Sequence, residues 1–381
     1  MTDEELHTHL LDQQGSRRSL NTPVLVVDLD ALTRNIARMA DFARAHGVQL
    51  RPHAKTHKSP EIAKRQLAAG AIGICCAKIG EAETMADNGV EHGLHITSPV
   101  VSAPAIARLI ALNARTDGLM CVVDNVSNVQ ALGEAAAAAG KPLCVLIDID
   151  PGIGRTGVRS PQAALALLQA IRANPALRYA GVQCYCGVQQ HIEGFEPRRQ
   201  AMQECAALMA TIIGVLRENG GQPQIVTGGG TGTHRIDAAL NIFTELQVGS
   251  YVFMDSQYLA CDLTGEGGPP PFETALLIDA RVVSANTPGL VTIDAGFKAF
   301  ATDAGAPAVL SGAPEGATYR FMGDEHGALI LPQGETLPLA HMVTLGAPHC
   351  DPTVNLYDTY HVVQGDTLRA LWPVAARGRS R

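Results

Sequence analysis

Residues 48–58 read VQLRPHAKTHK, a short strand pattern that passes directly into a loop rich in cations. An amphipathic helix pattern, 30–46, precedes it, and Asp30 is suited to cap that helix. Further strand patterns begin near Ile72, His92, Gly118, Leu143, Tyr179, Pro223 and Leu246, with helix patterns such as 103–114, 126–139, 161–173 and 200–218 between most of them. This alternation predicts an α/β protein with a parallel (β/α)8 barrel of the TIM type, although spacing alone leaves an open doubly wound sheet possible.

The chain changes character after the barrel pattern. The stretch 265–271, GEGGPPP, predicts a linker. Beyond it, alternating runs separated by turn residues predict a small, mainly antiparallel β domain. We therefore expect an N-terminal segment and strand, 1–29, that packs with the β domain, a barrel over 30–264, and the β domain over 265–381.

Composition excludes several classes of protein. Of the 381 residues 46% are hydrophobic and 17% charged, enough apolar material for a large core, and the net charge of −8 is no footprint for nucleic acid. Apolar runs are shorter than the roughly 20 residues that span a bilayer, and the acidic start MTDEELHTHL is unlike a signal peptide. None of the nine cysteines forms a CxxC pair. We expect a cytoplasmic enzyme that binds neither nucleic acid nor membrane.

The first candidate site follows the first barrel strand, because barrels collect their working residues where strands run into the following loops. Lys55 stands there among neighbouring cations. Such a lysine is a candidate for a depressed pKa and for Schiff-base chemistry. The alternative interpretation is a solvated basic turn.

The second candidate site follows the last two barrel strands, where barrels commonly bind phosphate. Residues 227–233 read TGGGTGT and residues 249–251 read GSY. Glycines let backbone N–H groups approach an anion, and hydroxyls add donors. The expected contacts come from Thr227, Gly229, Gly230, Thr231, Gly249, Ser250 and Tyr251. Together with a lysine at the first strand, this cradle predicts a pocket for a phosphorylated aldehyde.

The third candidate site is the run 348–355, PHCDPTVN, in the expected β domain. His349 and Asp351 are two residues apart, so in an extended chain both project from one face while Cys350 faces the other. Imidazole and carboxylate form a plausible partial shell for a hard or borderline divalent ion. An ordinary loop, or Cys350 as ligand, remain the alternatives.

RPHAKTHK, the turn GIGRTGV at 152–158, TGGGTGT and GSY together resemble the fold-type III pyridoxal-phosphate enzymes. The likeness is to the D-threonine aldolase and D-serine dehydratase-like group, and it runs from about Thr22 to Asp358. It implies a barrel followed by a β domain, a homodimer, and pyridoxal 5'-phosphate carried by Lys55 rather than Lys58.

The resemblance also implies roles for other residues. Arg155 would approach the cofactor ring oxygen, Tyr185 the ring, and His191 would be the general base at the substrate β-hydroxyl. A salt bridge, a packed core tyrosine and a surface histidine are the respective alternatives. His349 and Asp351 would hold a divalent metal, manganese first, with magnesium, cobalt or zinc also possible. The Asp form of this pair resembles the aldolase side of the group.

The function implied is retro-aldol cleavage of a D-β-hydroxy-α-amino acid. D-Threonine would give glycine and acetaldehyde, and D-3-hydroxyaspartate would give glycine and glyoxylate. The nearest alternative is a D-serine or 3-hydroxyaspartate dehydratase, which releases a keto acid and ammonia. A racemase, or a carrier that only stores the cofactor, fits less well because neither needs the metal pair.

Overall fold

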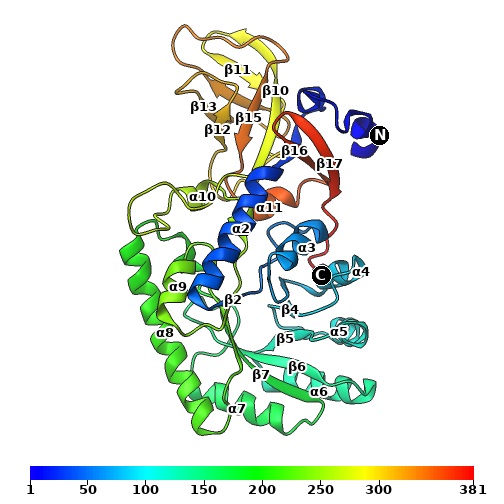
Figure 1. The fold of residues 1–381 in the computed structure, drawn as a ribbon, viewed down its shortest axis with the longest axis vertical. Coiled ribbons are helices and arrows are strands. Elements are labelled where there is room, and N and C mark those ends of the chain that lie inside the picture. The colour runs from blue at the N-terminus through cyan, green and yellow to red at the C-terminus, as the bar shows by residue number, and fades with distance from the viewer.

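The computed structural model describes residues 1–381, whose strands form two sheets stacked along the long axis of the molecule (Figure 1). The first sheet has eight strands in the order β2-β9-β8-β7-β6-β5-β4-β3, and all seven neighbouring pairs are parallel. A parallel bridge between His53 and Cys75 joins its two ends. The predicted barrel is confirmed. Its strands are β2 (Gln49–Leu50), β3 (Ile74–Cys76), β4 (Leu94–Ile96), β5 (Met120–Val123), β6 (Leu143–Asp148), β7 (Leu177–Cys184), β8 (Ile225–Gly228) and β9 (Glu245–Leu246).

Helices cover the outside of the barrel. They are α2 (Leu29–His46), α3 (Pro60–Ala68), α4 (Ile79–Asp87), α5 (Ala103–Arg115), α6 (Val126–Ala139), α7 (Pro161–Arg172), α8 (Phe195–Glu218) and α9 (His234–Leu240). Three of them begin with a serine N-cap followed by proline in the first turn, a frequent start signal. Helix α8 starts at Phe195, five residues before the predicted Gln200, because Pro197 lies in its first turn, where a missing N–H costs no hydrogen bond.

The second sheet has nine strands and is mainly antiparallel, as predicted. They are β1 (Val24–Asp28), β10 (Leu276–Thr287), β11 (Leu290–Ile293), β12 (Ala308–Ser311), β13 (Thr318–Phe321), β14 (Gly327–Ile330), β15 (Met342–Gly346), β16 (Thr359–Gln364) and β17 (Thr367–Pro373). Strand β1 lies between β10, antiparallel, and β16, parallel. The 264/265 boundary stays a proposal; it falls between α10 (Ser256–Leu259) and β10.

Short helices occupy the remaining positions: α1 (Asp3–His7), η1 (Thr8–Leu10), η2 (Ser16–Ser19), η3 (Val188–His191), η4 (Ser250–Val252) and α11 (Cys350–Val354). Helix α11 corrects the expectation of an extended chain at 348–355. Figure 1 shows it between the second sheet and the barrel. None of the helices is both long and apolar enough to cross a membrane.

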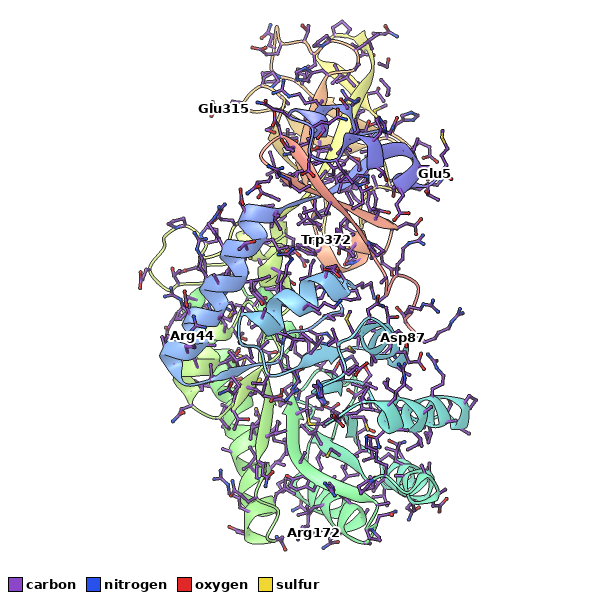
Figure 2. All side chains as sticks on the ribbon, turned by 45° about the vertical axis from the view of Figure 1, so that its right-hand side comes forward. Glu5, Arg44, Asp87, Arg172, Glu315 and Trp372 are labelled. Atoms are coloured by element: carbon purple, nitrogen blue, oxygen red, sulfur yellow. The ribbon has the colours of Figure 1, made fainter.

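The two sheets share one continuous core. Leu25 and Ile278 from the second sheet belong to the same buried cluster as Val145 from the barrel. Figure 2 shows Trp372 of β17 in the region where the second sheet meets the barrel. The guanidinium of Arg65 on α3 lies 4.8 Å from the ring centroid of Trp372. The barrel mouth is therefore fixed against the second sheet by packing.

A buried ion pair stabilises the barrel where β2 meets β9. The guanidinium of Arg51 binds both carboxylate oxygens of Glu245, at 2.8 and 2.9 Å, and the two side chains are 5% and 3% exposed. A Cβ at Gly73 would lie 2.1 Å from the Arg51 guanidinium, so only glycine leaves room for this pair.

We predict that Glu245→Gln lowers the stability of the protein by about 3–5 kcal/mol, because it leaves the arginine charge buried without its partner. Glu83→Gln is the matched control, since it breaks the half-exposed Arg108–Glu83 pair and costs less than about 1 kcal/mol. Chemical denaturation measures both changes. Equal losses in the two variants would contradict the assignment.

Candidate active site

Lys55 lies at the junction of the two sheets, in the loop that follows β2. Its Nζ is 3.2 Å from Oδ2 of Asp351, which lies in the first turn of α11. The Lys55 side chain is 39% exposed and that of Asp351 is 17% exposed. The second carboxylate oxygen, Oδ1 of Asp351, is buried and has no hydrogen-bond partner.

Lys55 is the lysine of this loop that is accessible to the site. Lys58, three residues later, is buried and its ammonium is paired with Glu81 on α4. Arg51 is likewise buried against Glu245. The cation-rich run therefore does not form a solvated basic turn, because two of its charges are neutralised inside the protein.

Lys55 and Asp351 shift each other's pKa. The carboxylate of Asp351 is the main cause that raises the pKa of Lys55, and it outweighs burial. Burial raises the pKa of Asp351, but the charge of Lys55, with a further effect of the neighbouring His349, brings it below its ordinary value. The expectation of a depressed lysine pKa was wrong for this form of the protein, because a carboxylate from the second sheet faces the amine.

A cavity of about 560 Å³ opens beside Lys55. Its lining includes Arg155 and Tyr185, which follow β6 and β7. The Arg155 guanidinium lies 5.6 Å and the Lys55 Nζ 5.8 Å from the Tyr185 ring centroid. Arg155 forms no ion pair, and Tyr185 is half-buried at the cavity wall; the roles expected of both residues at the cofactor stay predictions.

The floor of the cavity is a polar network that the sequence analysis missed. Gln183 donates to Oδ1 of Asp148 at 2.9 Å, and Gln247 donates to Gln183 at 3.1 Å and to Thr227 at 3.0 Å. His95 is also hydrogen-bonded to Gln183, at 2.9 Å. Burial raises the pKa of Asp148 to about 6. Thr227 is thus part of this floor. The sequence analysis missed Gln183 and Gln247 because a single glutamine at the end of a strand forms no recognisable motif.

The glycine-rich loops form a cradle next to this floor. The backbone N–H groups of Thr231, Gly249 and Ser250 are buried and donate to no acceptor in the protein. Thr231 Oγ1 accepts the N–H of Tyr251 at 3.0 Å, which leaves its own proton free to donate. A Cβ at Gly249 would lie 2.7 Å from Thr56 Oγ1, so this turn requires glycine. These donors suit an anion such as phosphate.

Three other expected cradle residues, Gly229, Gly230 and Tyr251, lie differently from one another. Gly229 has a φ of +66°, which makes the turn above Asp237 possible, and Gly230 donates its N–H to that carboxylate at 3.4 Å. The Tyr251 phenol instead points into the core, where its hydroxyl accepts a hydrogen bond from Gln66 at 3.0 Å. Tyr251 therefore contributes its backbone, and not its side chain, to the cradle.

His349 and Asp351 flank the start of α11. His349 is its N-cap, in an extended conformation, and Asp351 is already helical, so the pair does not share one strand face as expected. Cys350 between them is buried. Its backbone N–H donates to Oδ2 of Asp255 at 3.0 Å, and its thiol donates to the Met254 carbonyl at 3.6 Å. The arrangement favours the imidazole and carboxylate over the thiol as ligands.

His191 is the last residue of η3. Its ring centroid lies 4.7 Å from that of Tyr258. Burial is the main cause that lowers the pKa of His191, and the neighbouring His349 and Lys55 lower it further. His191 is therefore grouped with the site residues and stays neutral at pH 7.

A second group of ligand-type side chains, Asp3, His7 and His361, lies at the N-terminal segment, with atoms within 4.8 Å of one another. The N–H of Asn21 donates to Nε2 of His7, so Nδ1 carries the proton and faces Nε2 of His361 at 2.8 Å. Nδ1 of His7 and Nε2 of His361, the two nitrogens that would bind a metal, are therefore hydrogen-bonded to each other. We assign this group a structural role.

Comparisons with known proteins agree with this architecture. Residues 27–257 match the alanine racemase N-terminal domain family, and residues 275–363 match a putative serine dehydratase domain. A D-threonine aldolase of Arthrobacter sp. is 41% identical over 95% of this chain and 94% of its own. A 3-hydroxy-D-aspartate aldolase of Paracoccus denitrificans is 37% identical over 94% and 93%.

A related dehydratase is more distant in sequence. The D-threo-3-hydroxyaspartate dehydratase of Delftia sp. is 31% identical over 77% of this chain and 76% of its own. Among solved structures, that of D-threonine aldolase from Filomicrobium marinum superposes with a TM-score of 0.90 at 38% identity, covering 95% of this chain and 97% of the other.

We predict that Asp351→Asn lowers the pKa of Lys55, because it removes the charge that raises this pKa. A larger fraction of Lys55 is then neutral at a given pH, so in the cofactor-free protein its reductive methylation by formaldehyde becomes faster between pH 7 and 9. Peptide mapping by mass spectrometry measures this rate, with the exposed Lys64 as internal control. An unchanged pH profile of Lys55 would refute the assignment.

Proposed function

The chain belongs to the fold-type III family of pyridoxal-phosphate-dependent enzymes, in the group of the D-threonine and 3-hydroxy-D-aspartate aldolases, and we propose that it cleaves D-β-hydroxy-α-amino acids. The products are glycine and an aldehyde, acetaldehyde from D-threonine or glyoxylate from D-3-hydroxyaspartate. The observation that carries this proposal is the contact of Lys55, which lines the cavity, with Asp351, which lies two residues after His349. The aldolases are also more similar to this chain than the dehydratase is.

The cavity suits pyridoxal phosphate on several counts. Lys55 would carry it, the free N–H groups of the cradle would hold its phosphate, and Arg155 and Tyr185 would contact its ring. When bound, this cofactor is an electron sink that stabilises negative charge at the substrate α-carbon.

His349 and Asp351 would hold a divalent metal. The buried Oδ1 of Asp351, which has no partner, supports this assignment, as does the combination of imidazole and carboxylate. Manganese is the first choice, followed by magnesium, cobalt and zinc. The metal would supply Lewis-acid polarisation of the substrate hydroxyl.

The chain's own proton acceptor would be His191. Retro-aldol cleavage needs a base that removes the proton of the β-hydroxyl group. A histidine with a lowered pKa is neutral at pH 7, so its free ring nitrogen can accept that proton. The cavity floor of hydrogen-bonded glutamines would keep the opposite face of the site rigid.

We further propose that the chain acts as a cytoplasmic homodimer. Val101 lines the cavity and is 63% exposed, and Val188 in η3, beside His191, is 65% exposed. Large apolar side chains at a cavity mouth are typical of a surface that a partner covers. All nine cysteines are free thiols, which suits a reducing compartment.

The decisive experiment is product analysis with the purified, cofactor-loaded protein. We expect glycine and aldehyde from D-threonine and from D-3-hydroxyaspartate, with turnover lost on chelation and restored by manganese. Lys55→Ala should abolish turnover, whereas Lys64→Ala, a surface lysine on α3, should not. Ammonia and a keto acid as products would instead establish a dehydratase.

We predict that His191→Asn lowers kcat by about 10²–10⁴-fold with little change in KM, because it removes the proton acceptor but not a substrate anchor. In the unmodified protein, activity should fall in acid below the ordinary histidine pKa of 6.5, since the pKa of His191 is lowered and protonation of the base stops the reaction. Steady-state kinetics against pH measure both effects. The control is His92→Asn, an exposed histidine that does not line the cavity.

A further inference from the structure

The imidazole of His349 is hydrogen-bonded by a residue that the sequence analysis did not single out. Its Nδ1 lies 2.7 Å from Oδ2 of Asp303, a short, well-formed hydrogen bond. No other protein group hydrogen-bonds to this ring, so Nε2 is its nitrogen without a protein partner. Because a carboxylate accepts and Nδ1 donates, the bond selects the tautomer with the proton on Nδ1 and the lone pair on Nε2.

The loop that carries Asp303 is tied to the helix that carries His349. Asp303 lies between β11 and β12, in a separate part of the sequence. Two residues earlier, the N–H of Ala301 donates to Oγ1 of Thr353 at 3.0 Å, and this hydroxyl donates to the His349 carbonyl at 2.7 Å. Thr353 is completely buried. The contact therefore belongs to a built junction and is not an isolated surface pair.

From this geometry we infer that Asp303 is a positioning residue, which fixes the ring orientation and tautomer of His349 for binding a divalent metal through Nε2. The inference rests on the proposed metal role of His349. Carboxylates hydrogen-bonded to metal-binding histidines set the tautomer and raise the basicity of the ligand nitrogen. Asp303 acts through His349 and does not itself contact the metal.

The test is a manganese titration of the cofactor-loaded protein, followed by electron paramagnetic resonance of free Mn²⁺. We expect Asp303→Ala to weaken manganese binding by about 10–100-fold, and Asp303→Asn, which keeps an acceptor oxygen, to weaken it less. Glu315→Gln is the matched control, because Glu315 is an exposed carboxylate of the same sheet region that makes no hydrogen bond or ion pair. It should bind manganese like the unmodified protein.

A double-mutant cycle with His349→Ala separates positioning from direct ligation. If Asp303 acts through His349, then Asp303→Ala causes no further loss of affinity once His349 is alanine. A further loss would make Asp303 a ligand and overturn the inference, as would unchanged affinity in Asp303→Ala alone.

Failure of the metal assignment itself gives a different result. In that case His349→Ala would bind manganese as tightly as the unmodified protein, and the proposed role of His349 would fall with the inference. Nitrogen NMR of the His349 ring provides a readout independent of metal and activity. It should show the proton on Nδ1 in the unmodified protein and a mixture of tautomers in Asp303→Ala.

Discussion

The contact between Lys55 and Asp351 is the interaction on which the site depends, because each residue comes from a different sheet. Strand β2 has only two residues, and its register on β9 places the loop that carries Lys55 at the barrel mouth. On the other side, Asp255 accepts the N–H of Cys350 and so holds the start of α11. The Tyr360 hydroxyl donates to the His57 carbonyl at 2.6 Å and joins the two parts directly. Neither sheet alone would contain the site.

Burial determines which charged groups of the Lys55 loop are available to the cavity. The pKa of His57 is lowered to about 4 by burial, and that of His53 also falls well below its ordinary value, so both rings are neutral at pH 7. Arg51 and Lys58 have buried carboxylate partners. A run that reads as strongly basic in the sequence therefore presents one available amine to the cavity. This explains in physical terms why Lys55, and not Lys58, is suited to carry a cofactor.

The barrel and the position of its loops could be predicted because hydrophobic periodicity is local in the sequence, and parallel strands place successive loops at one end. Helix α11 could not, because five residues with a proline carry no recognisable period. Asp303 and the hydrogen bond of Gln183 were missed for a different reason: their partners, His349 and Asp148, lie 46 and 35 positions away in the sequence. Asp351 was identified as a ligand type, but its effect on the pKa of Lys55 needed the fold.

The electrostatics of the site also bear on which bond of the substrate breaks. Retro-aldol cleavage removes the proton of the β-hydroxyl group, whereas dehydration expels that oxygen with the help of an acid or a Lewis acid and removes the proton from the α-carbon. Burial, followed by the neighbouring His349 and Lys55, lowers the pKa of His191. At neutral pH it is thus ready to accept a proton and poorly suited to donate one. In the role proposed for His191, a neutral base of this kind serves the aldolase reaction by accepting the proton of the β-hydroxyl group.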